Sequence, residues 1–284
     1  MVTPDGRVVR YCLYGPPDGF PVLFHSGSPS TRWKRPDIIE ATEQSGIRML
    51  VSDRPGYGGS SRQRGRSVAD AAADAGALAD AQGWGRFAVA GGSGGGPHAL
   101  ACAALLPGRV TRCAVSASIS PPDVSGPAPD EDEDDPRRNL TSWLAARGEA
   151  QLRPHIEEAT HQIMASIEAG GPEVLPDPDA PDGSSARVQP AVDSPASMAR
   201  LRATFVDSHD GWVDDNIAFA TDWGFELGSV DVPVSIWFGS RDARSRSQAA
   251  WLAAAIGTAQ CHEYDGGHLQ PTSAYRRMLA WLRR

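Results

Sequence analysis

The residues best suited to chemistry in this sequence are a serine set among glycines at position 93 and a histidine near the C-terminus. Residues 87–97 read Phe-Ala-Val-Ala-Gly-Gly-Ser-Gly-Gly-Gly-Pro, a short apolar strand that runs through Gly-x-Ser-x-Gly into a helix. A serine in such a sharp turn exposes its hydroxyl, and the flanking glycines let neighbouring backbone pass close by. N–H groups at the start of the helix can stabilise a developing oxyanion. The pattern predicts that Ser93 is a nucleophile.

Two other kinds of glycine-rich turn fit these residues less well. A phosphate-binding P-loop needs Lys followed by Ser or Thr after its last glycine, whereas Pro97 and His98 follow here. A dinucleotide-binding turn follows the first strand of its unit and has an acidic residue about 20 positions later, which is absent here. A turn that only packs a helix on a strand is the remaining alternative.

The turn at Ser93 resembles the nucleophile elbow of the α/β-hydrolase superfamily, in which nucleophile, acid and histidine follow in that order along the chain. Residues 264–268, Tyr-Asp-Gly-Gly-His, resemble the Gly-His loop after the last strand of that family. Residues 232–242 resemble its strand followed by Gly-x-x-Asp. The resemblance implies that His268 is the general base and that Asp242 orients its imidazole.

Two alternatives concern the acid. Asp242 stands before a helical segment, where an aspartate commonly caps the helix. Asp123 follows the strand that ends near residue 118, and some family members carry the acid at that place.

The second oxyanion donor is expected in an early loop. Residues 22–29, Val-Leu-Phe-His-Ser-Gly-Ser-Pro, resemble the family's His-Gly-x-Pro loop with Ser26 inserted. The resemblance implies that the backbone N–H groups of Ser28 and Gly94 form the oxyanion hole. Residues 53–60 match the family's Asp-Arg-x-Gly-x-Gly-x-Ser loop, for which we expect a structural role.

Weaker candidates for substrate binding lie near these motifs. His98 lies on the helix behind Ser93 and is either a packing or a pocket residue. Aromatic residues before the last strands resemble a Trp-Gly-Phe stretch of bacterial members, and they line the acyl pocket or pack at its seam. The candidates are His25, Gly27, His98, Trp212, Trp223 and Phe225.

The rest of the chain must position these residues. Short apolar strands, expected near residues 8–13, 21–24, 48–51, 86–90, 112–117, 232–238 and 260–264, alternate with Ala-rich helices at 67–82 and 97–106. We therefore predict the α/β class, with an α/β-hydrolase fold: a mostly parallel central sheet flanked by helices. A mostly helical cap, residues 121–229, is predicted to be inserted after the sixth strand, between core segments 1–120 and 230–284. Its acidic run at 130–135 is expected to be a solvated loop.

Composition narrows the function further. The 284 residues are 40% hydrophobic and carry a net charge of −8, which argues against disorder and against binding of duplex nucleic acid. The four cysteines are scattered, with no metal-ligand spacing, and reduced thiols are expected. The N-terminus lacks a signal-like pattern and no apolar run is long enough for a bilayer, so a cytoplasmic protein without membrane contact is expected. Its partner is a small-molecule substrate; the oligomeric state stays open, with a homodimer as one option.

The resemblance also implies a reaction class. Dehalogenases and epoxide hydrolases of the family need an aspartate where Ser93 stands, so acyl transfer on an ester, thioester or lactone remains, without metal or cofactor. A proline iminopeptidase-like aminopeptidase and a cofactor-independent C–C hydrolase or perhydrolase are the enzymatic alternatives. A catalytically silent small-molecule binder is the alternative outside enzymes.

Overall fold

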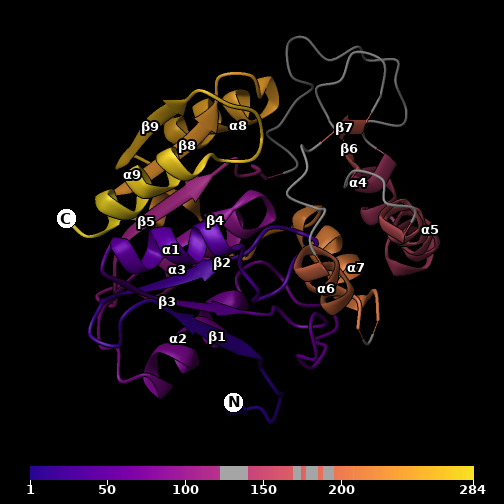
Figure 1. Ribbon diagram of the computed structural model, residues 1–284, viewed down its shortest axis with the longest axis horizontal. Helices are drawn as coiled ribbons and strands as arrows, with labels where there is room; N and C mark the ends of the chain where they lie inside the picture. Colours follow the sequence, from indigo (N-terminus) through magenta and orange to yellow (C-terminus); the bar gives the residue numbers. More distant parts are fainter. Residues whose placement is uncertain (122–139, 169–173, 177–184, 188–194, 207) are drawn as a thin grey trace.

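A computed structural model describes residues 1–121, 140–168, 174–176, 185–187, 195–206 and 208–284 (Figure 1). Its centre is a seven-stranded sheet of order β1-β3-β2-β4-β5-β8-β9, in which only β1 is antiparallel to its neighbour. The strands are β1 (Tyr11–Tyr14), β2 (Phe20–His25), β3 (Ile47–Ser52), β4 (Phe87–Gly92), β5 (Val110–Ser116), β8 (Val234–Gly239) and β9 (Ala259–Tyr264). The predicted α/β-hydrolase fold is therefore confirmed.

Helices cover both faces of this sheet (Figure 1). The helices α1 (Pro36–Gln44) and α9 (Thr272–Leu282) pack on one face, and α2 (Ala71–Ala81), α3 (Gly96–Leu105) and α8 (Ala243–Ala255) pack on the other. Along β4, Val89 joins the core of one face while Ala88 and Ala90 join the core of the other. Because both faces are buried, the central strands read as nearly continuous apolar runs.

All seven predicted strands are present, with ends that differ by at most three residues. The insertion follows β5, the fifth strand along the chain, and not the sixth, because five strands precede residue 121. The helices α1 and α9 were not predicted from the sequence.

Between β5 and β8, the described residues form four helices and a small hairpin. They are α4 (Leu140–Ala145), α5 (Glu149–Glu168), β6 (Val174–Pro176), β7 (Ser185–Arg187), α6 (Pro195–Thr204) and α7 (Asp210–Phe219). The helices α4, α5 and α7 share a small apolar core, separate from the two sheet cores, that contains Leu152, Ile156 and Val213. The cap boundaries at 121 and 229 stay a prediction, and the acidic run at 130–135 and Asp123 lie outside the described residues.

The helix α7 rests directly on the loop of residues 53–60. A Cβ on Gly56 would lie 2.6 Å from the backbone nitrogen of Gly211, and a Cβ on Gly211 would lie 2.5 Å from the ring of Tyr57. The Gly211 N–H also donates to the carbonyl of Gly56 at 3.2 Å. Only glycine at both positions lets the helix and the loop approach this closely.

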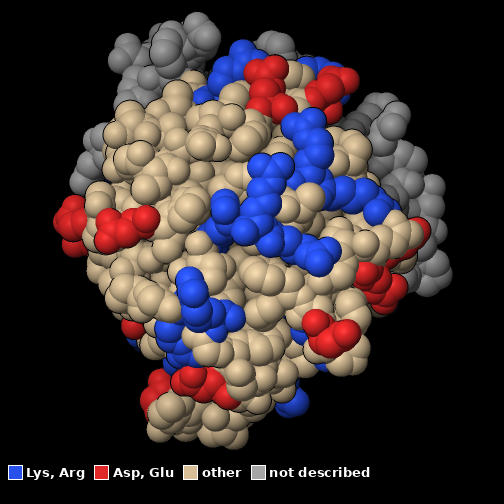
Figure 2. Space-filling model, turned by 90° about the vertical axis from the view of Figure 1, so that its left-hand side faces the viewer, with Lys and Arg blue, Asp and Glu red and all other residues tan. Residues whose placement is uncertain are grey.

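Three further features of the structure concern its charged surface, its cysteines and the length of its helices. Basic side chains form a branched band, flanked by acidic clusters, on the side of the molecule that lies to the left in Figure 1 (Figure 2). The four cysteines, Cys12, Cys102, Cys113 and Cys261, are free. Within the described ranges, none of the helices combines the length and apolar character that a bilayer crossing requires.

Candidate active site

The predicted nucleophile stands at the junction of β4 and α3. Ser93 has a φ of +50°, a left-handed conformation that non-glycine residues rarely adopt. A 3-10 turn, Ser93–Gly95, follows and leads into α3. A Cβ on Gly91 would lie 2.2 Å from the carbonyl oxygen of Gly95, so the turn closes only with glycine there. In this strained turn Ser93 is partly exposed.

The structure brings Ser93, His268 and Asp242 together from three different loops. The Nε2 atom of His268 lies 3.1 Å from the Oγ of Ser93, and its Nδ1 lies 2.9 Å from Oδ2 of Asp242. The serine follows β4, the aspartate follows β8 and the histidine follows β9. Since these strands are parallel, their carboxyl ends lie at the same edge of the sheet. This arrangement can pass a proton from the serine hydroxyl to the imidazole.

Asp242 also caps α8, so the capping role and the contact with His268 are compatible. Its Oδ1 accepts from the backbone N–H of Ser245 at 2.9 Å, and its Oδ2 accepts from the Ser245 hydroxyl. Burial raises the pKa of Asp242, but the hydrogen bonds from His268 and Ser245 outweigh it and lower the pKa to about 2. The carboxylate is therefore ionised at neutral pH and accepts the Nδ1–H of His268.

The two loops that carry the acid and the histidine pack tightly. A Cβ on Gly239 would lie 2.4 Å from the carbonyl oxygens of both Gly266 and Gly267. The Arg241 N–H donates to the carbonyl of Gly266 at 2.9 Å. These contacts fix the position of the imidazole relative to the carboxylate.

The early loop lies against the elbow, as its predicted role requires. A Cβ on Gly27 would lie 3.4 Å from the Cβ of Ser93, and one on Gly94 would lie 3.0 Å from the Cβ of Ser28. In the part of the chain that the structure describes, no acceptor is hydrogen-bonded to the Ser28 N–H. This N–H and that of Gly94 are thus available at the same place, beside the nucleophile.

A buried ionic cluster is hydrogen-bonded to residues 26–28 of the early loop. Asp215 on α7 is fully buried, and its carboxylate lies 2.6 Å from Nη2 of Arg54 and 2.6 Å from Nη2 of Arg66. Burial raises the pKa of Asp215, but the two guanidinium groups outweigh this effect and hold the pKa well below its usual range. The Arg54 guanidinium also donates to the carbonyl oxygens of Ser26 and Gly27.

The two candidate histidines of this region are buried beneath the loop and the elbow. The side chain of His98 is 1% exposed, and its Nδ1 lies 2.8 Å from the carbonyl oxygen of Gly94. His25 is 4% exposed, stacks on His98 and lies 3.4 Å from the sulfur of Cys102. Burial, together with the charge of Arg54, lowers the pKa of both imidazoles, to about 3 for His25. Of the two roles weighed for His98, the structure shows packing under the elbow.

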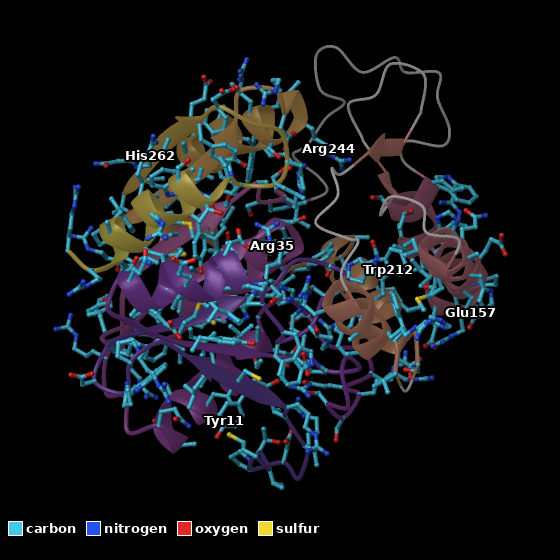
Figure 3. All side chains as sticks on the ribbon, in the orientation of Figure 1. Tyr11, Arg35, Glu157, Trp212, Arg244 and His262 are labelled. Carbon is cyan, nitrogen blue, oxygen red and sulfur yellow. The ribbon has the colours of Figure 1, made fainter. Side chains whose placement is uncertain are left out.

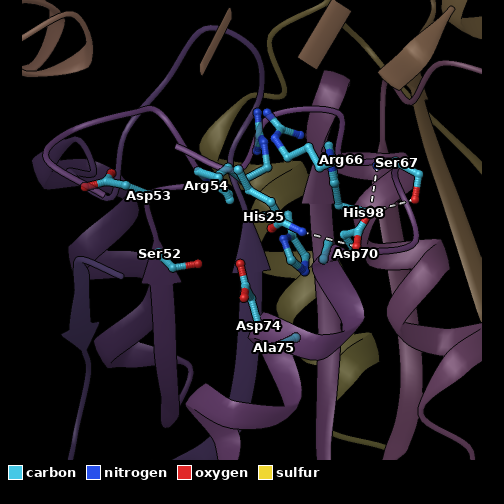
Figure 4. Close-up of a pocket in the computed structure, with 13 residues that line it drawn as sticks. His25, Ser52, Asp53, Arg54, Arg66, Ser67, Asp70, Asp74, Ala75 and His98 are labelled. Carbon is cyan, nitrogen blue, oxygen red and sulfur yellow. Dashed lines mark hydrogen bonds between the residues drawn. The ribbon is translucent and has the colours of Figure 1, made fainter. Parts of the chain in front are cut away.

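A cavity of about 20 Å³ adjoins these histidines (Figure 4). Arg54, Arg66 and Asp74 line it together with His25 and His98, whereas the residues of the predicted triad do not. The volume is enough for about one water molecule, far below the roughly 300 Å³ or more of typical ligand pockets. This cavity is therefore too small for a substrate of ordinary size.

The aromatic candidates have packing contacts. Trp223 is 3% exposed, belongs to the main core and stacks on Phe225 with ring centroids 6.0 Å apart. Trp212 on α7 packs against the small apolar core of α4, α5 and α7 (Figure 3). Of the alternatives weighed for these residues, packing at the seam describes Trp223 and Phe225.

Two residues of the site were missed by the sequence reasoning. Neither Asp215 nor Phe219 was singled out as a site residue from the sequence. A Cβ on Gly94 would lie 3.0 Å from Cζ of Phe219, whose ring also contacts that of His98. Both residues lie on α7, one helical turn apart, and they reach the early loop (Asp215) and the elbow (Phe219) only through tertiary contacts. Among the residues described, no group of three or more His, Cys, Asp or Glu side chains is arranged to hold a metal ion.

Part of the chain is similar in sequence to a known protein. A non-heme chloroperoxidase from Streptomyces lividans is 32% identical over 125 residues, which span 43% of this chain and 45% of that protein. The match thus spans less than half the length of that relative.

Two solved structures share the fold over nearly the whole chain. A bromoperoxidase from Bacillus anthracis is 19% identical, with a TM-score of 0.69, covering 98% of this chain and 95% of that one. The enol-lactonase from Burkholderia xenovorans is 20% identical, with a TM-score of 0.62, covering 98% of this chain and 94% of that one. At these identities the likeness concerns the fold alone.

The family model described as alpha/beta hydrolase fold matches residues 21–271, which include β2 to β9, the elbow at Ser93 and His268. The protein belongs to the alpha/beta hydrolase fold family.

Proposed function

We propose that this protein is a serine hydrolase that cleaves a small-molecule carboxylic ester, thioester or lactone through an acyl-enzyme on Ser93. The observation that carries the proposal is the continuous contact from Ser93 through His268 to the ionised Asp242, at 3.1 Å and 2.9 Å. An accessible hydroxyl, a base within hydrogen-bond distance and a group that orients the base are the parts that nucleophilic catalysis needs.

The proposed mechanism has two half-reactions, acylation and deacylation of Ser93, and His268 acts first as a base and then as an acid in each. His268 Nε2 takes the proton of Ser93 as its oxygen attacks the carbonyl carbon, and the resulting oxyanion accepts from the N–H groups of Ser28 and Gly94. The imidazolium then gives its proton to the leaving alcohol or thiol. Water, deprotonated by His268, attacks the acyl-enzyme and releases the carboxylic acid, and Ser93 recovers its proton.

A second candidate is perhydrolysis, in which hydrogen peroxide replaces water in the last step and releases a peracid. It is supported by the 32% identity to a protein named as a non-heme chloroperoxidase. The same nucleophile and base would serve both reactions, so the difference between them lies in the second attacking molecule.

A fluorophosphonate probe tests the nucleophile. We expect stoichiometric labelling of the wild-type protein and none of the folded Ser93→Ala variant. Labelling that persists in this variant would assign the reactive hydroxyl elsewhere, and no labelling of the folded wild type would favour the silent binder.

A substrate panel tests the reaction class. The panel contains p-nitrophenyl esters of graded chain length, lactones, a thioester and a prolyl-anilide, with peracid formation from acetate and hydrogen peroxide measured in parallel. Turnover of esters, thioesters or lactones supports the proposal. Cleavage restricted to the prolyl-anilide would favour an aminopeptidase, and turnover that appears only with peroxide would favour perhydrolysis.

A further inference from the structure

The early loop of residues 22–29, which carries the proposed oxyanion donor Ser28 and is called the oxyanion loop below, is held in place by a side chain of the helix α7. Asp215 lies on α7, 187 positions after Ser28 in the sequence, and its Oδ2 accepts from the Ser28 hydroxyl. The same oxygen accepts from the Tyr57 hydroxyl at 3.0 Å, and the other oxygen accepts from Nη2 of Arg66 at 2.6 Å. Hydrogen bonds from several protein donors to both oxygens restrict the orientation of this carboxylate.

The Ser28 side chain is fully engaged by this cluster. Its hydroxyl has one proton, which it donates to Asp215, and Nη2 of Arg54 donates to the same oxygen at 2.7 Å. Because the proton points to an ionised carboxylate, the hydroxyl has none left for an acyl oxygen. The backbone N–H of Ser28 has no hydrogen-bond acceptor among the described residues, so it is the group of this residue that can donate.

Arg54 extends the same support to the two preceding residues. It donates to the carbonyl oxygens of Ser26 and Gly27, and its own charge is balanced by Asp215. The peptide planes before and at Ser28 are therefore held by hydrogen bonds that all trace back to one carboxylate. An oxyanion donor must be held in place within a fraction of an ångström to be effective.

We propose that Asp215 is a positioning residue for the oxyanion loop, which it holds through the Ser28 hydroxyl and the Arg54 guanidinium so that the Ser28 backbone N–H donates to the acyl oxygen. The inference rests on the proposed function. Its consequence is that the Ser28 hydroxyl acts as an anchor and not as a donor to the oxyanion.

The main test is Ser28→Ala, which keeps the backbone N–H and removes only the anchor. We expect kcat for p-nitrophenyl butyrate to fall about tenfold with KM changed less than twofold, because the loop matters in the transition state and not in the bound substrate. The Ki of an alkyl trifluoromethyl ketone, whose adduct with Ser93 places an oxyanion in the hole, should rise by the same factor. A loss of kcat below threefold, or an unchanged Ki, overturns the proposal.

Asp215→Asn provides the second arm. It leaves two buried guanidinium groups undercompensated, so reduced stability is expected and activity is measured below the unfolding transition. We expect a kcat loss of about 100-fold. If Asp215 acts through Ser28, adding Ser28→Ala to Asp215→Asn lowers kcat by less than twofold more. Losses that multiply in the double variant overturn the proposal.

The neighbouring residue supplies a matched control. Asp214 is also on α7 and also binds an arginine, with one oxygen 2.7 Å from Nη2 of Arg62. Among the described residues, none of its hydrogen bonds or ion pairs reaches the early loop. Asp214→Asn is expected to lower stability with kcat within twofold of the wild type. A wild-type protein that neither hydrolyses the ester nor reacts with a fluorophosphonate refutes the proposed function, and this inference falls with it.

Discussion

Asp242→Asn is the substitution for which the structure predicts the largest loss with the least change in shape. Oδ1 of Asp242 accepts from the backbone N–H of Ser245 at 2.9 Å, so the oxygen of the new amide must take this position. The amide nitrogen then stands where Oδ2 stood, 2.9 Å from Nδ1 of His268. Two donors cannot face each other, so Nδ1 loses its proton and Nε2 carries it.

This tautomer cannot accept the proton of Ser93. In triads of this kind, the wrong tautomer costs a factor of about 10⁴ in kcat, which corresponds to about 5.5 kcal/mol of transition-state stabilisation. The Ser245 hydroxyl does not relieve the problem, because it rotates to accept from the amide nitrogen and leaves the amide orientation as it is. We therefore expect Asp242→Asn to reduce kcat for p-nitrophenyl butyrate by about 10⁴ while KM stays within threefold.

The assay is initial-rate hydrolysis near neutral pH, with circular dichroism to establish that the variant is folded. The control is Asp265→Asn, which removes a carboxylate from the loop before His268, where the Asp265 side chain is 89% exposed and pairs with Arg241. The control should retain at least half of the wild-type kcat. A reduction smaller than tenfold in folded Asp242→Asn would refute the tautomer argument and the assignment of the acid.

Three further outcomes follow from the geometry. Gly95→Ala puts a Cβ 2.1 Å from the carbonyl oxygen of His25, so ester turnover should fall about 100-fold and Tm should drop, while Gly85→Ala, with open space around its Cβ, should change neither. The pKa of Asp242, lowered to about 2 in the folded protein, contributes about 2 kcal/mol of stability above about pH 4 that is lost toward pH 2. Urea unfolding of Asp242→Asn should therefore depend less steeply on pH over that interval, and an equal slope contradicts the sign. Trp223→Ala should lower the free energy of unfolding by about 3–5 kcal/mol with KM nearly constant, whereas a large rise in KM would make it a pocket residue.

The sequence was most informative where one residue type satisfies a local requirement. The strands were found because burial on both faces leaves uninterrupted apolar runs. The elbow was found because only glycines fit around Ser93. The helix α9 was missed although Tyr275, Met278, Leu279 and Leu282 are spaced for one buried helical face, so its signal was present but not used. The helix α1 gave a weaker signal, since only two of its residues are fully buried.

The contributions of α7 could not be found in this way. Asp214 and Asp215 are identical in type and adjacent, yet one pairs with Arg62 near the surface and the other with Arg54 in the interior. Both aspartates are buried, and which of them reaches Arg54 depends on how α7 lies on the loop of residues 53–60. That contact involves Gly56 and Gly211, 155 positions apart. No local pattern contains this relationship, because the partners meet only in the folded chain.

The helix α7 contacts both the oxyanion loop and the nucleophile elbow. Asp215 holds the oxyanion loop, and Phe219, one turn later on the same helix, contacts the backbone of the nucleophile elbow. A helix is rigid over one turn, so a substrate group that shifted α7 at Phe219 would also shift the carboxylate that anchors Ser28. The fit of a substrate against α7 and the geometry of the proposed oxyanion hole would then not be independent. For such a substrate, a poor fit would lower kcat as well as raise KM, and discrimination would depend on the transition state.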